Sequence, residues 1–173
     1  MRITILGAGS WGLCLCVHLF KKGERDLKVF ELFENKVQEI NKYRENKDAL
    51  PGIKIPKEIQ ISSSLYDSIK ETELLICAMP SFEFHSMFDK LSKILKNDVA
   101  ILNVAKGFTE NGLRLSEVIR KAGYKKIAVL SGPSHAEEVS KNIPAAVVVA
   151  STDAHFAKEM QTLLSTDMFR VYT

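Results

Sequence analysis

Hydrophobic and polar positions divide the chain into short apolar runs and longer segments of mixed character. The short runs are rich in Val, Ile and Leu and predict buried strands. They lie at residues 3–6, 27–31, 59–61, 74–78, 99–104, 127–130, 145–150 and 169–172. The longer segments carry apolar residues at helical spacing and predict amphipathic helices. These lie at residues 10–22, 35–46, 82–95, 113–121, 134–140 and 154–164.

Glycine and proline mark the boundaries of these segments. Gly23 and Gly123 end two of the predicted helices, and Pro51 interrupts the chain after the second helix. Ser134 is predicted to cap the helix at 134–140, with Glu137 completing a capping box. The boundaries therefore support a regular alternation of strand and helix.

Strands that are apolar on both faces belong in a parallel sheet covered by helices on both sides. We therefore predict an α/β fold with a doubly wound, mainly parallel sheet and helices on both faces. The last strand or two are expected to be antiparallel or mixed. The sequence contains no internal repeat or linker, so residues 1–173 are predicted to form one domain.

Composition narrows the class of protein. The chain has 173 residues, of which 46% are hydrophobic and 26% charged, and this balance excludes a disordered chain. The net charge of +3 comes from interleaved acidic and basic residues, so no nucleic-acid partner is expected. Cys14, Cys16 and Cys77 are expected to be buried, inert thiols rather than metal ligands, and no metal site is predicted. With no signal peptide and no membrane span expected, the predicted location is cytoplasmic.

The sequence Gly7-Ala8-Gly9-Ser10-Trp11-Gly12 follows a predicted strand and opens a predicted helix. In this context the glycine spacing is typical of a dinucleotide-binding, Rossmann-like fold. Gly7 allows a tight turn, Gly9 lets the backbone approach a pyrophosphate, and Gly12 lets helix and strand pack closely. The first N–H groups of the helix would then bind the phosphates.

Glu31 ends the second predicted strand, nineteen positions after Gly12. A carboxylate at this position accepts hydrogen bonds from the adenosine ribose and repels a 2′-phosphate. The sequence therefore favours NAD(H) over NADP(H). Two alternatives remain open: Glu31 is a solvated surface residue, or its charge is offset by Lys28 or Lys36.

Two further candidates follow predicted strands. Lys106 comes just after the strand at 99–104, where open α/β sheets bind ligands, and could pair with an anionic substrate or polarise a carbonyl group. The turn Ser131-Gly132-Pro133-Ser134-His135 offers N–H groups and a hydroxyl to a phosphate. His135 could be a general acid, although a histidine beside a helix start is more often structural. Lys106 alone would more often be an ordinary surface lysine.

Six short motifs are spread along nearly the whole chain: GAGSWG, NKDALPG, MPS, AKG, SGPSHAEEV and FRVYT. In this order they resemble the NAD(P)-dependent glycerol-3-phosphate dehydrogenases of bacterial type. The resemblance implies hydride transfer between dihydroxyacetone phosphate and sn-glycerol 3-phosphate, which supplies phospholipid synthesis. It implies cofactor contacts at Ser10, Trp11 and Ala136, substrate contacts at Gly132 and Ser134, and contacts to both at Lys106. His135 is not a catalytic residue of the family.

The chain departs from this family in two respects. Many bacterial members carry His or Arg just after the second strand, whereas this chain has Leu32 and Phe33. Phe33 is expected to lie against the adenine, and the departure favours NAD(H). Family members also continue past FRVYT into a helical domain that holds a catalytic lysine and further substrate contacts. We therefore expect this chain alone to be inactive, and any homodimer to belong to the full-length enzyme.

Two other functions compete with this interpretation. The chain could be a free-standing or truncated dinucleotide-binding module without turnover. It could also be a reductase of similar plan, such as a 6-phosphogluconate or 3-hydroxyacyl dehydrogenase, although AKG and SGPSHAEEV argue against this. In the favoured interpretation, Lys106 stabilises negative charge on the reacting carbonyl, and the proton comes from the second domain.

Overall fold

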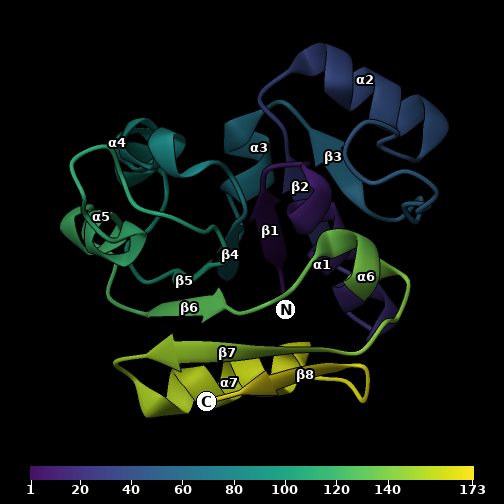
Figure 1. Ribbon diagram of the computed structural model, residues 1–173. Coiled ribbons are helices and arrows are strands. Elements are labelled where there is room, and N and C mark those ends of the chain that lie inside the picture. The colour runs from purple at the N-terminus through teal and green to yellow at the C-terminus, as the bar shows by residue number, and fades with distance from the viewer.

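The computed structural model describes all 173 residues and contains one eight-stranded sheet (Figure 1). The strand order is β3-β2-β1-β4-β5-β6-β7-β8. The strands are β1 (Ile3–Leu6), β2 (Leu27–Phe30), β3 (Gln60–Ser62), β4 (Leu74–Cys77), β5 (Ala100–Asn103), β6 (Ile127–Ser131), β7 (Ala145–Ser151) and β8 (Phe169–Tyr172). Neighbours from β3 to β6 are parallel, β7 is antiparallel to β6, and β8 is parallel to β7. The predicted doubly wound sheet with a mixed end is confirmed.

Helices cover both faces of the sheet because its central strands are apolar on both sides (Figure 1). One face is covered by α1 (Ser10–Lys21), α6 (Ala136–Ser140) and α7 (Ala154–Leu164), whose buried residues share one apolar core. The other face is covered by α3 (Leu65–Ile69), α4 (Phe84–Ile94) and α5 (Leu115–Lys121), which share a second core. The remaining helix, α2 (Glu34–Tyr43), packs Val37 and Ile40 into the first core.

Several helix boundaries differ from the predictions. The predicted helix 35–46 ends at Tyr43, because Arg44 adopts a left-handed backbone with φ of 50°. The first turn of predicted helix 82–95 is a 3₁₀ helix, Ser81–Glu83. The five-residue α3 was missed, because it is too short to show helical periodicity.

The predicted capping role of Ser134 is wrong. Helix α6 begins at Ala136, and His135 occupies the position before it without a capping side-chain bond. Ser134 lies one residue earlier and is buried. Asp153 caps α7, because its Oδ1 accepts the N–H groups of His155 and Phe156 at 2.9 and 3.1 Å.

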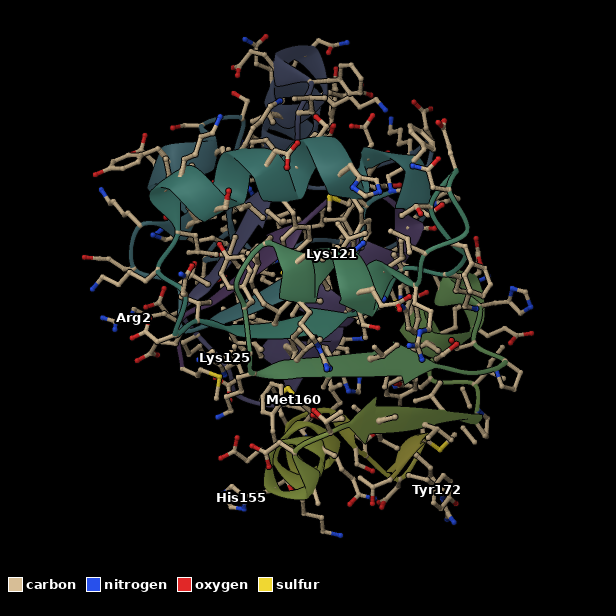
Figure 2. The ribbon with its side chains drawn as sticks, turned by 90° about the vertical axis from the view of Figure 1, so that its left-hand side faces the viewer. Arg2, Lys121, Lys125, His155, Met160 and Tyr172 are labelled. Atoms are coloured by element: carbon tan, nitrogen blue, oxygen red, sulfur yellow. The ribbon has the colours of Figure 1, made fainter.

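The runs at 145–150 and 169–172 were predicted to form buried strands, but buried and exposed residues alternate in β7 and β8. Val147 and Val171 are buried against α7, whereas Val148 and Tyr172 on the other face are each 51% exposed. Figure 2 views the sheet from the side of α4 and α5, and β7 lies below both helices. These two strands are therefore covered by a helix on one side only.

All three cysteines are buried and unpaired, as predicted. Burial raises the pKa of the Cys14 and Cys16 thiols to about 12 and also raises that of Cys77. Thiols in this state are poor nucleophiles, because the reactive thiolate is disfavoured. None of the helices has the length and apolar character that crossing a membrane requires.

Candidate functional site

A cavity of about 620 Å³ lies at the edge of the sheet where β1, β2, β4, β5 and β6 end. Most of the residues singled out in the sequence line it, although they are far apart along the chain. They are Gly7, Gly9, Ser10, Trp11, Glu31, Phe33, Lys106, Ser134, His135 and Ala136. Open α/β sheets bind ligands at this edge, so the fold brings the candidates to the expected place. Gly12 and Gly132 do not line the cavity.

The glycine-rich loop between β1 and α1 is shaped by close packing at Gly7 and Gly12. Gly7 has φ of +106°, and a Cβ there would lie 3.0 Å from the Ala78 carbonyl oxygen. A Cβ on Gly12 would lie only 2.1 Å from the Gly7 carbonyl oxygen, so α1 packs directly on the loop. A Cβ on Gly9 would meet no atom within 4 Å, because Gly9 faces open space at the cavity. The loop is therefore closely packed on one side and open on the other.

Glu31 is half-buried at the end of β2 and turns toward the glycine-rich loop. Its Oε2 accepts the N–H of Ala8 at 3.2 Å, and its Oε1 accepts the N–H of Phe33 at 3.2 Å. Lys28 does not offset this charge by direct contact, because its Nζ donates to the Asp67 carbonyl oxygen at 3.3 Å. Each carboxylate oxygen keeps a free lone pair for a further donor.

Lys36 is the other cation that could offset the Glu31 charge, and it lines the same cavity as Glu31. Its Nζ lies 5.1 Å from the centre of the exposed Phe33 ring. A smaller cavity of about 150 Å³ shares Gly9, Glu31 and Lys36 with the first. Glu39 and Asp48 also line the smaller cavity, so its carboxylates outnumber its ammonium groups.

The opposite wall of the main cavity joins the ends of β5 and β6. Lys106 lies just beyond β5, and its Nζ donates to the Ser134 carbonyl oxygen at 3.4 Å. Ser134 is 7% exposed, whereas His135 is exposed at the cavity. The pairing of strands β5 and β6 thus brings together two residues that are 28 positions apart.

Two predicted contact residues also have packing roles. The Trp11 ring lies edge-on to Phe169, with centroids 6.2 Å apart, and packs against the first apolar core. A Cβ on Gly132 would lie 2.9 Å from the Val147 Cα, so glycine is needed where β6 meets β7. Gly132 therefore shapes the turn that leads to Ser134 without lining the cavity itself.

The sequence reasoning missed part of the cavity wall. Met79 and Pro80 follow β4, and Val104 and Ala105 follow β5. Their position directly after apolar strands could have predicted this, because residues that follow the strands of a parallel sheet lie together at one edge of the sheet. Their side chains carry no charge or nucleophile, and they therefore drew no attention as single residues.

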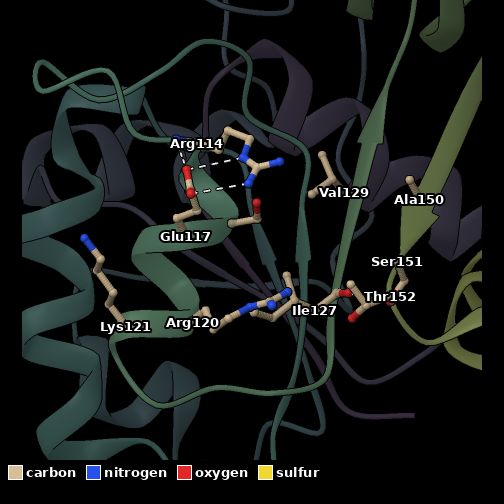
Figure 3. A pocket seen from close by; sticks show the side chains of 10 residues that line it. Arg114, Glu117, Arg120, Lys121, Ile127, Val129, Ala150, Ser151 and Thr152 are labelled. Atoms are coloured by element: carbon tan, nitrogen blue, oxygen red, sulfur yellow. Dashed lines mark hydrogen bonds and ion pairs between the residues drawn. The ribbon is translucent and has the colours of Figure 1, made fainter.

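A second cavity of about 630 Å³ lies between α5, the first half of β6 and the end of β7 (Figure 3). None of the residues singled out in the sequence lines it. Its most prominent polar contact is the exposed pair of Arg114 and Glu117, with Nε and Oε2 3.3 Å apart. Hydrogen bonding to Arg114 lowers the pKa of the Glu117 carboxyl. The second cavity therefore contains none of the candidate residues.

Comparison with known proteins agrees with this geometry. Residues 2–157 match the family model described as NAD-dependent glycerol-3-phosphate dehydrogenase N-terminus. The glycerol-3-phosphate dehydrogenase [NAD(P)+] of Clostridium acetobutylicum is 39% identical over 173 residues, which cover 99% of this chain and 52% of the relative. That of Carboxydothermus hydrogenoformans is 38% identical over 177 residues, covering 100% of this chain and 52% of the relative.

A solved structure shares both sequence and fold. The crystal structure of glycerol-3-phosphate dehydrogenase from Coxiella burnetii superposes with a TM-score of 0.92 and 32% identity, covering 98% of this chain and 52% of that chain. The chain therefore spans about half the length of the relatives that it matches. The matched residues, the shared fold and the glycine-rich loop agree: this chain belongs to the NAD-dependent glycerol-3-phosphate dehydrogenase family and corresponds to its N-terminal part.

Proposed function

We propose that the chain binds a nicotinamide dinucleotide in the main cavity and is the cofactor-binding part of a glycerol-3-phosphate dehydrogenase. One observation carries the proposal: the glycine-rich loop, the start of α1, Glu31 and the Lys106–Ser134 pair all line a single cavity. The loop supports phosphate binding, the carboxylate supports ribose binding, and the lysine supports an anionic substrate.

The glycine-rich loop fits the phosphates of a dinucleotide. The space beside Gly9 would be narrowed by any Cβ there, and α1 begins at Ser10 with no acidic residue in its first turn. The first N–H groups of a helix have no intrahelical partner and carry partial positive charge. Ser10 and Trp11 would therefore bind phosphate oxygens through their backbone, and Ala136 would contact the cofactor from the start of α6.

We further propose that NAD(H) is preferred to NADP(H). The Glu31 carboxylate has room to accept ribose hydroxyls beyond its two backbone donors. A 2′-phosphate at this position would face Glu31, and Glu39 and Asp48 in the adjoining cavity, against the single ammonium of Lys36. Like charges disfavour binding, so the adjoining cavity supports the same preference as Glu31. Phe33 would lie against the adenine from the exposed side.

We assign substrate binding to Lys106 and Ser134 in the main cavity, with Gly132 shaping the turn before Ser134. The Lys106 ammonium would bind dihydroxyacetone phosphate and stabilise negative charge that develops on its carbonyl oxygen. When bound, the nicotinamide cofactor supplies the hydride. We assign no proton donor among residues 1–173, and we therefore propose turnover for a protein that also has the second half of the longer relatives. The buried, unpaired thiols support a reducing compartment such as the cytoplasm.

Calorimetric titration of the chain with NADH and NADPH tests the proposal. We expect NADH to bind at least about tenfold more tightly. Glu31→Gln should reduce this difference in affinity. Glu34→Gln is the control: it changes the charge by the same amount nearby, but Glu34 lies outside both cavities, so the difference should remain. Tighter binding of NADPH would overturn the NAD(H) preference, and no binding of either cofactor would overturn the dinucleotide site.

Addition of dihydroxyacetone phosphate separates cofactor binding from turnover. We expect the chain to bind NADH without oxidising it, because it spans about half the length of its relatives. Oxidation of NADH by this chain alone would show that residues 1–173 contain a complete catalytic site. The assignment of the proton donor would then be wrong.

A further inference from the structure

We propose that Asn46 is a positioning residue that directs the Gly9 N–H toward the phosphates of the dinucleotide. The inference rests on the proposed function and adds a residue from outside the glycine-rich loop to its phosphate site. Asn46 belongs to NKDALPG, a segment that follows α2 and lies 38 residues from Ala8 in sequence. It lines the small cavity beside Glu31 rather than the main one.

The Asn46 amide makes two hydrogen bonds that fix its orientation. Its Nδ2 donates to the Ala8 carbonyl oxygen at 2.9 Å, and its Oδ1 accepts the Ala49 N–H at 3.1 Å. Reversing the amide would set a donor against a donor and an acceptor against an acceptor, so only this orientation satisfies both neighbours. Ala8 is 1% exposed, and no other donor within the chain reaches its carbonyl oxygen. A buried carbonyl that loses its donor is costly, and the contact is therefore strongly favoured.

This contact determines where the next N–H points. The peptide bond is planar and trans, so the Gly9 N–H points away from the Ala8 carbonyl group. Asn46 holds that carbonyl on the side of the small cavity, and Glu31 holds the Ala8 N–H at 3.2 Å. The Gly9 N–H donates to no group of the chain, and Gly9 lines the main cavity. The peptide between Ala8 and Gly9 is thus held by side chains while its N–H stays free for a ligand.

The segment that carries Asn46 is itself firmly held. The Arg44 Nη2 donates to the Ile59 carbonyl oxygen at 2.8 Å, and Nε donates to that of Ile55 at 3.3 Å. Leu50 and Ile55 are 2% and 3% exposed in the first apolar core. The segment therefore provides a fixed support, so that the Asn46 amide holds the Ala8 carbonyl rather than following its motion.

The variant Asn46→Asp tests this role with nearly unchanged shape. The carboxylate still accepts the Ala49 N–H, but its second oxygen faces the Ala8 carbonyl and repels it. We expect the Kd for NADH and for ADP to rise by about tenfold or more, with the Kd for adenosine within about twofold of wild type. Adenosine lacks the phosphates, so a general loosening of the site would weaken all three ligands alike. Asn46→Leu removes the amide without adding charge and should weaken NADH and ADP in the same way, which separates positioning from repulsion by the new carboxylate. Glu45→Gln is the control for the segment, because Glu45 binds Lys54 and Gly52 without contacting the glycine-rich loop.

Each outcome decides one claim. An NADH affinity of Asn46→Asp equal to that of wild type overturns the positioning role and leaves the dinucleotide site intact. Equal weakening of NADH and adenosine also overturns it, since Asn46 would then support the whole site. Failure of the wild-type chain to bind NADH or ADP overturns the proposed function and this inference with it. The expected result is selective loss of the phosphate-bearing ligands, with a changed Gly9 amide resonance in the ligand-free variant.

Discussion

Replacing Gly12 by Ala should destabilise the fold by an amount that follows from one distance. The added Cβ would lie 2.1 Å from the Gly7 carbonyl oxygen and 3.2 Å from the Ala78 Cβ. Carbon and oxygen atoms that are not bonded rarely approach closer than about 3 Å, so α1 and the loop must separate by about 1 Å. The obstructing atom is backbone and cannot move by a simple rotation. Overpacking of a rigid site costs about 1–3 kcal/mol, and we expect the upper end of this range.

A matched substitution lies three residues earlier. A Cβ on Gly9 meets no atom within 4 Å, and Gly9 has φ of −72°, which any residue adopts. Gly9→Ala should therefore change the free energy of unfolding by less than about 1 kcal/mol. Its methyl group would nevertheless project into the space that we assign to the phosphates, so NADH binding should weaken by about tenfold or more.

Thermal unfolding and NADH titration of both variants distinguish the two effects. Gly12→Ala should lower the melting temperature by about 6–12 °C, as expected for about 3 kcal/mol in a chain of this size. Gly9→Ala should lose affinity while keeping nearly full stability. If Gly12→Ala is as stable as the wild type, then the close packing of α1 on the loop is wrong. If Gly9→Ala binds NADH normally, then the phosphates do not approach Gly9.

Three further predictions concern the rest of the fold. The three cysteines should not react with a thiol reagent until urea unfolds the chain, and rapid reaction of the native chain would contradict their burial. Burial lowers the pKa of His18 below its usual 6.5, and its Nε2 lies 2.7 Å from the Leu164 carbonyl oxygen. As pH falls through 6.5 the unfolded chain therefore binds the proton first, and the free energy of unfolding should decrease; His18→Gln should lack this part of the pH dependence. Asp153→Ala removes the cap of α7 and should cost about 1 kcal/mol in urea unfolding, and an unchanged midpoint would contradict the cap.

The fold was largely predictable because its strands are short, apolar and separated by long amphipathic segments. The predictions were wrong where local signals compete, as at Ser134, and a very short helix, α3, was missed. Ser134 has the residue type of a helix cap, but the turn after β6 buries it, and α6 begins two residues later. The end of α2 depends on Arg44, whose left-handed backbone is supported by bonds to residues 55–59 that no local pattern indicates.

In the candidate site, too, residues with a local sequence pattern were predictable and contacts between distant segments were not. Gly7, Gly9 and Gly12 could be chosen as candidates because their spacing is local, and Glu31 because one helix and one strand, α1 and β2, separate it from the glycines. The contact of Asn46 with Ala8 could not, since it depends on how a long connection folds back over the loop. The packing of Trp11 on Phe169 likewise joins the two ends of the chain and has no local signature.

The order of the strands has a consequence for synthesis on the ribosome. Strand β1 is made first but lies inside the sheet, between β2 and β4. The main cavity takes its lining from segments that extend from Gly7 to Glu137. A nascent chain that has emerged only as far as β4 therefore exposes the glycine-rich loop without the Lys106–Ser134 wall opposite. The complete pocket is available to a ligand only after most of the chain has left the exit tunnel, so ligand binding cannot assist the earliest folding events.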